Sequence, residues 1–167
     1  NVAHRFNGRH PPREGISSFS MIYPQFRAIL LHGDRSMKKI LIVEDEPDIQ
    51  ELLRTYLEDA GYETAAAGDG VAALDLFHAQ PFDLVLLDVL LPKIDGFGVC
   101  ELIRRQSQVP ILMLTALDGE EEQLRGFGLD IDDYVTKPFS IPVLLEKIRV
   151  ILRRRGAEAE PRRLRYR

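Results

Sequence analysis

Short runs of consecutive apolar residues alternate along this chain with segments of helical periodicity. The runs cover residues 40–43, 84–87 and 111–114. Unbroken apolar runs of this length are typical of strands that are buried on both faces, as in a parallel sheet covered by helices. Polar residues follow each run, so we expect Glu44-Asp45, Asp88 and Thr115 at the carboxyl ends of three strands.

The segments between the runs predict helices. Pro47 suits the first position of a helix and Gly61 its end, and the second helix lies between Asp69-Gly70 and Pro81. A loop at 92–96 precedes the third helix. The apolar positions at helical spacing are Ile49, Leu52, Leu53, Tyr56, Leu57 and Ala60 in the first helix, Val71, Leu74 and Phe77 in the second, Val99, Leu102 and Ile103 in the third, and Leu144, Leu145, Ile148 and Leu152 in the last.

Two weaker strands and a fourth helix complete the pattern. Residues 64–67 and Tyr134-Val135 predict strands, and Asp118 with Glu121 resembles a capping box at the start of a helix. Strand and helix then alternate five times, with the right-handed crossovers that chain chirality imposes. The sequence therefore predicts an α/β fold: a doubly wound (βα)5 arrangement around a parallel five-stranded sheet.

The charge is distributed unevenly over the 167 residues. Segments 1–36 and 153–167 carry five and seven arginines against two acidic residues each, which leaves 10 basic and 22 acidic residues in 37–152, a net charge of −12. A region that acidic repels nucleic acid, so we expect any DNA contact to come from elsewhere. The single cysteine, Cys100, excludes an internal disulfide and fits the reducing cytoplasm, and no apolar run is long enough for a membrane span.

Composition also suggests the domain boundaries. Met37-Lys38-Lys39 directly before a strand resembles a natural start, and residues 1–36 mix His, Arg, Gly and Pro without a period. We expect 1–36 to be an N-terminal extension that is disordered or non-native, 37–154 to form the folded domain, and 155–167 to be an Arg-rich linker or tail. The alternative for the first segment is a short native extension whose apolar stretch at 19–31 docks on the domain.

The polar residues at the strand ends suit phosphoryl chemistry. Carboxylates crowded at adjacent strand ends repel one another unless a cation neutralises them, and sparse oxygen ligands are what Mg²⁺ prefers. An aspartate can accept a phosphoryl group as an acyl phosphate, for which Lys137 offers positive charge and Thr115 a hydroxyl donor. Each signal alone has a simpler explanation, such as a solvated acidic turn or a surface lysine, and their order along the chain is what favours a site.

Four stretches carry a family resemblance: ILIVEDEP, LVLLDVLLPKIDG, ILMLTA and DDYVTKPF. In order and spacing they resemble the response-regulator receiver domain of two-component signalling, over about 37–154. The resemblance implies a flavodoxin-like receiver fold and a protein that is no enzyme beyond catalysing its own phosphorylation and dephosphorylation. It implies that Asp88 accepts phosphate from a phosphohistidine of a sensor histidine kinase.

The resemblance also implies the other site residues. Mg²⁺ would be held by Asp45, Asp88 and the Leu90 carbonyl, with Glu44 assisting directly or through water. The phosphoryl group would be held by Lys137, Thr115 and the backbone N–H groups of Leu90 and Ala116. Thr115 and Tyr134 would form the switch pair, in which the hydroxyl moves onto the phosphate and the aromatic ring swings inward.

The last third of the domain resembles the OmpR/PhoB-type transcription factors, in which a receiver is linked to a DNA-binding domain. Phosphorylated members of that subfamily form homodimers through the face that carries Arg125, Asp132, Asp133, Lys147 and Arg154 here. The chain departs from the usual pattern at Val143, where a Glu is usual, and at Asp130-Ile131, where Gly-Ala is usual. We therefore expect a weak dimer, and DNA binding only through an effector domain absent from this chain.

Two other functions stay open. A single-domain receiver would act by binding a partner protein. An aspartyl-phosphate hydrolase of the haloacid-dehalogenase type would place Asp-x-Asp after the first strand, where this chain has none. We expect the phosphoacceptor receiver, located in the cytoplasm and without membrane contact.

Overall fold

The structure, a computed structural model, describes residues 37–116, 128 and 130–159. Its elements, in chain order, are β1 (Lys39–Val43), α3 (Pro47–Asp59), β2 (Glu63–Ala67), α4 (Gly70–Ala79), β3 (Leu84–Asp88), α5 (Gly96–Arg104), β4 (Ile111–Thr115), β5 (Asp133–Thr136) and α7 (Ile141–Ala159). The expected fourth helix at Asp118 and Glu121, the predicted site residue Arg125 and the extension 1–36 lie outside the described residues.

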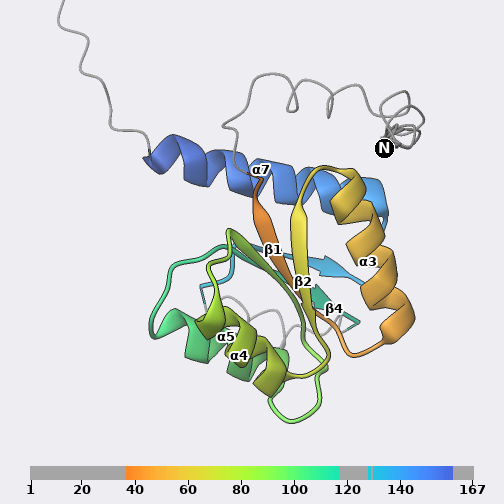
Figure 1. Ribbon diagram of the computed structural model, residues 1–167, viewed down its shortest axis with the longest axis vertical. Coiled ribbons are helices and arrows are strands. Elements are labelled where there is room, and N and C mark those ends of the chain that lie inside the picture. Colours follow the sequence, from red (N-terminus) through yellow and green to blue (C-terminus); the bar gives the residue numbers. More distant parts are fainter. Residues whose placement is uncertain (1–36, 117–127, 129, 160–167) are drawn as a thin grey trace, which may run out of the picture. The chain divides into compact units, whose positions relative to one another are not determined.

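The sheet has five parallel strands in the order β2-β1-β3-β4-β5. Helices α4 and α5 lie together on one face, and α3 and α7 lie on the other (Figure 1). Because both faces are covered, β1, β3 and β4 are almost completely buried. The predicted parallel five-stranded sheet is confirmed.

The order of the strands decides where a site can form. The chain passes from β1 outward to β2 and then returns to β3 on the other side of β1, so the direction of winding reverses between β1 and β3. Ligands of open α/β sheets bind at the carboxyl ends of the strands beside such a reversal. Val43 pairs with Leu87 at this place, so the residues after β1 lie beside the end of β3.

The turn before β5 contains Asp130-Ile131, one of the two places where the sequence departs from the pattern it resembles. Asp130 adopts a left-handed backbone with φ of 56°, a conformation in which a glycine is more usual and which Asp tolerates better than most residues. The Asp130 carbonyl accepts a hydrogen bond from Arg104 Nε at 3.0 Å, and the Ile131 side chain packs against the core. The departure is therefore accommodated without opening the fold.

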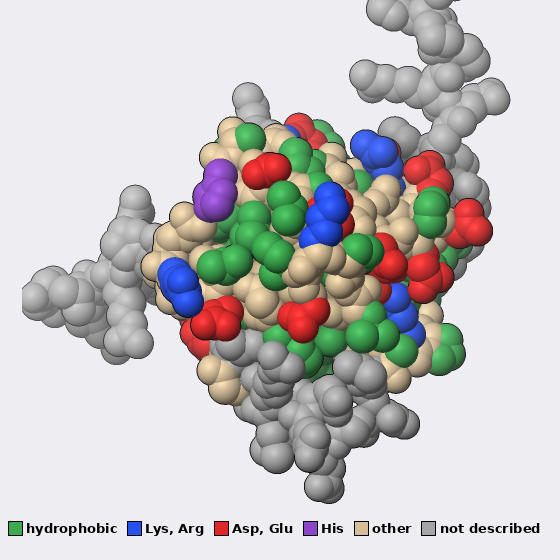
Figure 2. Space-filling model, turned by 90° about the horizontal axis from the view of Figure 1, so that it is seen from below, with side chains coloured by type: hydrophobic (Ala, Val, Ile, Leu, Met, Phe, Trp, Pro, Cys, Tyr) green, Lys and Arg blue, Asp and Glu red, His purple; other side chains and the backbone are tan. Residues whose placement is uncertain are grey.

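The surface over α4 and α5 is mixed in character. Apolar side chains gather near the centre of this face, with acidic and basic side chains around them (Figure 2).

Helix α7, on the other face, continues to Ala159, five residues past the domain boundary expected at 154. The boundary itself stays a prediction. None of the helices in the described part of the chain has the length and apolar character that a membrane span requires.

Candidate functional site

Three carboxylates meet at the carboxyl ends of β1 and β3. Glu44 and Asp45 follow β1, and Asp88 is the last residue of β3. One carboxylate oxygen from each lies within 4.8 Å of the others. Glu44 and Asp88 are 0% and 3% exposed, whereas Asp45 is exposed. The cluster is therefore buried on one side and open to solvent on the other.

These donors fit a small, hard divalent cation. All three side chains offer oxygen only, and the exposed position of Asp45 leaves room for water or phosphate oxygens to complete a coordination shell. Mg²⁺ prefers such a sparse carboxylate set, completed by water and phosphate. The predicted grouping of Glu44, Asp45 and Asp88 is present in the structure.

Lys137 supplies the positive charge of the cluster. Its Nζ lies 2.7 Å from Asp88 Oδ2 and 3.0 Å from Glu44 Oε2, and the side chain is 15% exposed. The backbone N–H of Lys137 donates to the Thr115 carbonyl at 2.7 Å, which fixes the end of β5 to the end of β4. The following peptide bond to Pro138 is cis.

Burial and the neighbouring charges change the pKa values of this pair. The pKa of Glu44 is raised to about 7, chiefly by burial; the nearby Asp88 charge also raises it, whereas the hydrogen bond from Lys137 lowers it. Burial lowers the pKa of Lys137, but the hydrogen bonds to Asp88 and Glu44 outweigh it and leave this pKa raised. The ammonium therefore stays charged, while Glu44 takes up a proton more readily than an exposed carboxylate.

The remaining predicted residues lie around the cluster. Thr115 is buried at the end of β4, the neighbour of β3, and Ala116 follows it at an exposed position. The Leu90 N–H donates to Asp88 Oδ1 at 3.2 Å, so this backbone donor already faces the carboxylate. Tyr134 lies half-buried in β5, one strand further along the sheet.

Two contacts at the start of α3 were missed by the sequence analysis. The backbone N–H of Glu46 donates to Glu44 Oε1 at 3.2 Å, and Gln50 Nε2 donates to the Glu44 carbonyl at 2.9 Å. Pro47 was the signal in the sequence from which the Glu46 contact could have been predicted. It marks the start of a helix, and the unpaired backbone N–H groups of a helix start then lie beside Glu44.

Three residues of the predicted dimer face, Asp132, Asp133 and Lys147, form ion pairs within the chain. Lys147 Nζ lies 2.9 Å from Asp133 Oδ2 and 3.3 Å from the Tyr134 carbonyl. Asp132 forms an ion pair with Arg155, at 3.2 Å. Arg154, which the sequence placed on this face, has no ion pair among the described residues.

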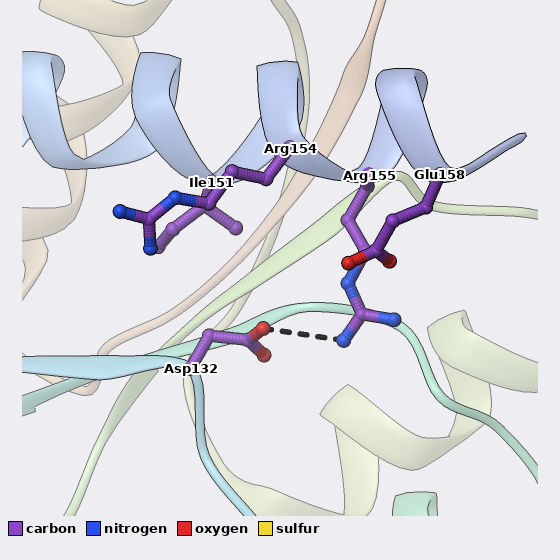
Figure 3. A pocket seen from close by; sticks show the side chains of 5 residues that line it. All are labelled: Asp132, Ile151, Arg154, Arg155 and Glu158. Carbon is purple, nitrogen blue, oxygen red and sulfur yellow. Dashed lines mark hydrogen bonds and ion pairs between the residues drawn. The ribbon is translucent and has the colours of Figure 1, made fainter. Parts of the chain in front are cut away.

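Figure 3 shows how Asp132 and Arg155 meet at the end of α7. They line a hollow of about 310 Å³ together with Ile151, Arg154 and Glu158. The Arg154 side chain extends in the other direction from that of Arg155 (Figure 3).

Asp132 is also held from the side of the sheet. Its Oδ2 accepts the Ile111 N–H at 2.8 Å and lies 3.5 Å from Arg104 Nη2. The Arg155 contact was not foreseen, because the family resemblance assigns its neighbour Arg154 to this face. The place of Arg155 on helix α7 and the direction of its side chain become visible only in the fold.

Residues 40–149 match the protein family described as the response regulator receiver domain. The chain is 48% identical over 122 residues to a probable transcriptional regulator, ycf27, of Guillardia theta, which covers 73% of this chain and 48% of the relative. It is 43% identical over 121 residues to the DNA-binding dual master transcriptional regulator RpaA of Synechocystis, covering 71% of this chain and 50% of that protein. The chain thus spans about half the length of these curated relatives.

Solved structures show the same fold. The receiver domain of the Francisella response regulator 1452 superposes with a TM-score of 0.68 at 33% sequence identity, over 71% of this chain and 98% of that one. The predicted flavodoxin-like receiver fold is confirmed by this likeness together with the strand order.

We expect Glu44→Gln to change how stability depends on pH in magnesium-free buffer. The pKa of Glu44 is about 7 in the folded protein, against an ordinary value of 4.5, so the folded state binds this proton more tightly than the unfolded state does. The free energy of unfolding contributed by Glu44 therefore falls as pH rises from about 4.5 to about 7. Urea denaturation across this window should show the wild type losing stability relative to Glu44→Gln. A difference in the free energy of unfolding between the two proteins that stays constant with pH would contradict the raised pKa of Glu44. The control is Glu46→Gln, which changes an exposed neighbouring carboxylate.

Proposed function

This chain belongs to the response regulator receiver domain family. We propose that Asp88 is its phosphoacceptor and is phosphorylated by a sensor histidine kinase. The observation that carries the proposal is the contact of Lys137 Nζ with Asp88 Oδ2 at 2.7 Å, inside the buried cluster that ends β1 and β3. Asp88 is the buried carboxylate that faces both the ammonium and the acid pair.

The transfer itself needs little covalent help from the protein. A carboxylate oxygen of Asp88 forms a bond to phosphorus, and the phosphorus–nitrogen bond of the donor phosphohistidine breaks. The electron pair returns to the imidazole nitrogen, and an acyl phosphate remains on Asp88. Catalysis then consists of placing the donor in line and neutralising the charge on the equatorial oxygens.

The residues around Asp88 supply these functions. Lys137 would contact one phosphoryl oxygen, because its ammonium is already within hydrogen-bond distance of Asp88. The N–H groups of Leu90 and Ala116 and the Thr115 hydroxyl would donate to the others. Glu44, Asp45, Asp88 and the Leu90 carbonyl would hold Mg²⁺, which neutralises phosphate charge when bound.

The switch would run from β4 to β5 and α7. A phosphoryl group on Asp88 would draw the Thr115 hydroxyl inward and vacate space for the Tyr134 ring. Lys147 bonds both Asp133 and the Tyr134 carbonyl, so a movement of Tyr134 disturbs the contact between β5 and α7. A phosphoryl group shifts this equilibrium only by its differential contacts with the two states.

The output of the switch is proposed from the relatives. Both curated relatives named above are transcriptional regulators by name, which supports an OmpR/PhoB-type regulator whose DNA contact is made by a part that this chain does not cover. We place the protein in the cytoplasm, where histidine kinases present their phosphohistidine. A single-domain receiver acting on a partner protein is the second candidate, and the missing Asp-x-Asp after β1 disfavours a hydrolase.

We expect that incubation with acetyl phosphate and Mg²⁺ adds one phosphoryl group to the wild type and none to Asp88→Asn. The amide keeps the shape of the side chain but cannot attack phosphorus. Asp83→Asn is the matched control, because Asp83 lies just before the other end of β3, where its carboxylate accepts the Lys39 N–H at 2.8 Å. Intact-mass measurement decides the result, and equal labelling of Asp88→Asn would refute the assignment.

We expect phosphorylation to produce a weak, salt-sensitive homodimer through the face that carries Asp133 and Lys147. Exposed ion pairs contribute only about 0.2–1 kcal/mol each, and salt screens them. In a two-fold dimer each pair counts twice, and Val143 cannot add one. Sedimentation at low and high salt measures the effect. Lys147→Met should weaken the dimer, whereas Arg54→Met, which removes an exposed pair with Glu58 on α3, should not. A tight dimer that is indifferent to salt and phosphate would overturn this face.

A further inference from the structure

The loop that follows Asp88 is held against the junction between β2 and α4. This loop, residues 89–95, carries Leu90, whose N–H faces Asp88 Oδ1. Its ends are fixed by backbone hydrogen bonds from Val89 N–H to the Leu114 carbonyl at 3.0 Å and from Gly96 N–H to the Val89 carbonyl at 2.8 Å. Its middle, residues 92–94, contacts Asp69-Gly70 instead.

Gly70 makes the closest of these contacts. Its N–H donates to the Pro92 carbonyl at 3.3 Å. A Cβ placed on Gly70 would lie 2.3 Å from the Ile94 carbonyl oxygen and 2.7 Å from Ile94 Cβ. Backbone atoms of the loop therefore occupy the space that any side chain at position 70 would need. The missing Cβ, and not an unusual backbone angle, is the reason for a glycine here.

Asp69 adds a second contact to the same loop. Its Oδ1 accepts the Ala72 N–H at 2.8 Å and so caps α4, while its Oδ2 lies 3.2 Å from Lys93 Nζ. Lys93 has a left-handed backbone with φ of 68°, which turns the loop toward this junction. Because the Lys93 side chain is 61% exposed, the ion pair adds little by itself. The close approach at Gly70 is the stronger constraint.

We propose that Asp69-Gly70 is a seat for the loop 89–95, and that Gly70 is a positioning residue for the chemistry at Asp88. The seat sets the distance of the Leu90 N–H and carbonyl from the Asp88 carboxylate, although it touches neither phosphate nor metal. This inference rests on the proposed phosphoacceptor function and deepens it. It assigns Asp69, the N-cap of α4, and Gly70, the first residue of α4, to the alignment of the site.

The size of the effect follows from the geometry. An added methyl group would have to move about 1 Å away from the Ile94 carbonyl to reach ordinary contact distance. A displacement of about 1 Å in a positioning element can cost about 100-fold in rate. The exposed pair of Asp69 with Lys93 should matter much less.

The test compares Gly70→Ala with Gly68→Ala in the full chain. A Cβ on Gly68 meets nothing within 4 Å, so this nearby glycine is the matched control. The readouts are the second-order rate constant of phosphorylation by acetyl phosphate, the dissociation constant of Mg²⁺ by calorimetric titration, and the NMR shift of the Leu90 amide without any ligand. We expect Gly70→Ala to lower this rate constant by about 10- to 100-fold, to weaken Mg²⁺ binding and to move the Leu90 amide, with Gly68→Ala unchanged.

The outcomes separate the seat from the proposed function. A folded Gly70→Ala protein with wild-type rate, Mg²⁺ affinity and Leu90 shift would overturn the seat. A wild type that accepts no phosphate would overturn the proposed function, and the Leu90 shift and Mg²⁺ affinity of the variant would still decide on the seat. If Gly70→Ala does not fold, Asp69→Ala replaces it. That variant loses both the hydrogen bond that caps α4 beside Gly70 and the Lys93 pair, so it loosens the start of α4 on which the loop rests. A shift of the Leu90 amide in it supports the seat, and an unmoved amide contradicts it.

Discussion

The ammonium of Lys137 between Glu44 and Asp88 is the interaction on which the site depends. Two carboxylates that are almost without solvent contact lie within 4.8 Å of each other and of Asp45, an arrangement that burial and mutual repulsion both oppose. Contacts of 2.7 Å and 3.0 Å from a single ammonium offset that cost. Removing one partner of a buried ion pair typically costs about 3–5 kcal/mol, because it leaves the other charge buried and uncompensated, so loss of Lys137 would leave two buried carboxylates without a neutralising charge. In the proposed function the same ammonium would remain on a phosphoryl oxygen when Asp88 is phosphorylated.

The fold brings these charges together from three separate parts of the chain. The reversal of winding between β1 and β3 places Glu44-Asp45 beside Asp88, and the backbone contact between β5 and β4 brings Lys137 within reach. The loop after Asp88 depends in turn on a glycine in another helix, Gly70. Local charge chemistry at one edge of the sheet is thus set by contacts between elements that are distant in sequence.

The core of this arrangement could be predicted from the sequence, because apolar runs that end in polar residues determine both the strands and their carboxyl ends. Glu44, Asp88 and Lys137 were found in this way, and the structure brings them together. The strand β2, with its alanines, gave only a weak signal, although its position was correct to one residue. Family resemblance supplied what periodicity could not, namely the prediction that Asp88 is the acid that accepts phosphate.

Contacts that depend on side-chain direction could not be predicted. The sequence assigned Arg154 and Asp132 to one face, but in the fold Asp132 pairs with Arg155, Arg104 and the Ile111 N–H. The contact of Gly70 with Ile94 also could not be predicted, because a glycine directly after Asp69 is equally typical of an ordinary helix start. Both findings require the packing of α7 and α4 against loops far away in the chain.

Chemical trapping of the phosphorylated side chain tests the central claim most directly. Borohydride reduces an aspartyl phosphate to homoserine, and peptide mass spectrometry then locates the changed residue. After treatment with acetyl phosphate and Mg²⁺, homoserine should be found at position 88 alone. Homoserine at position 45, or a phosphoryl group that resists borohydride, would contradict the account of Asp88 as the acceptor held by Lys137.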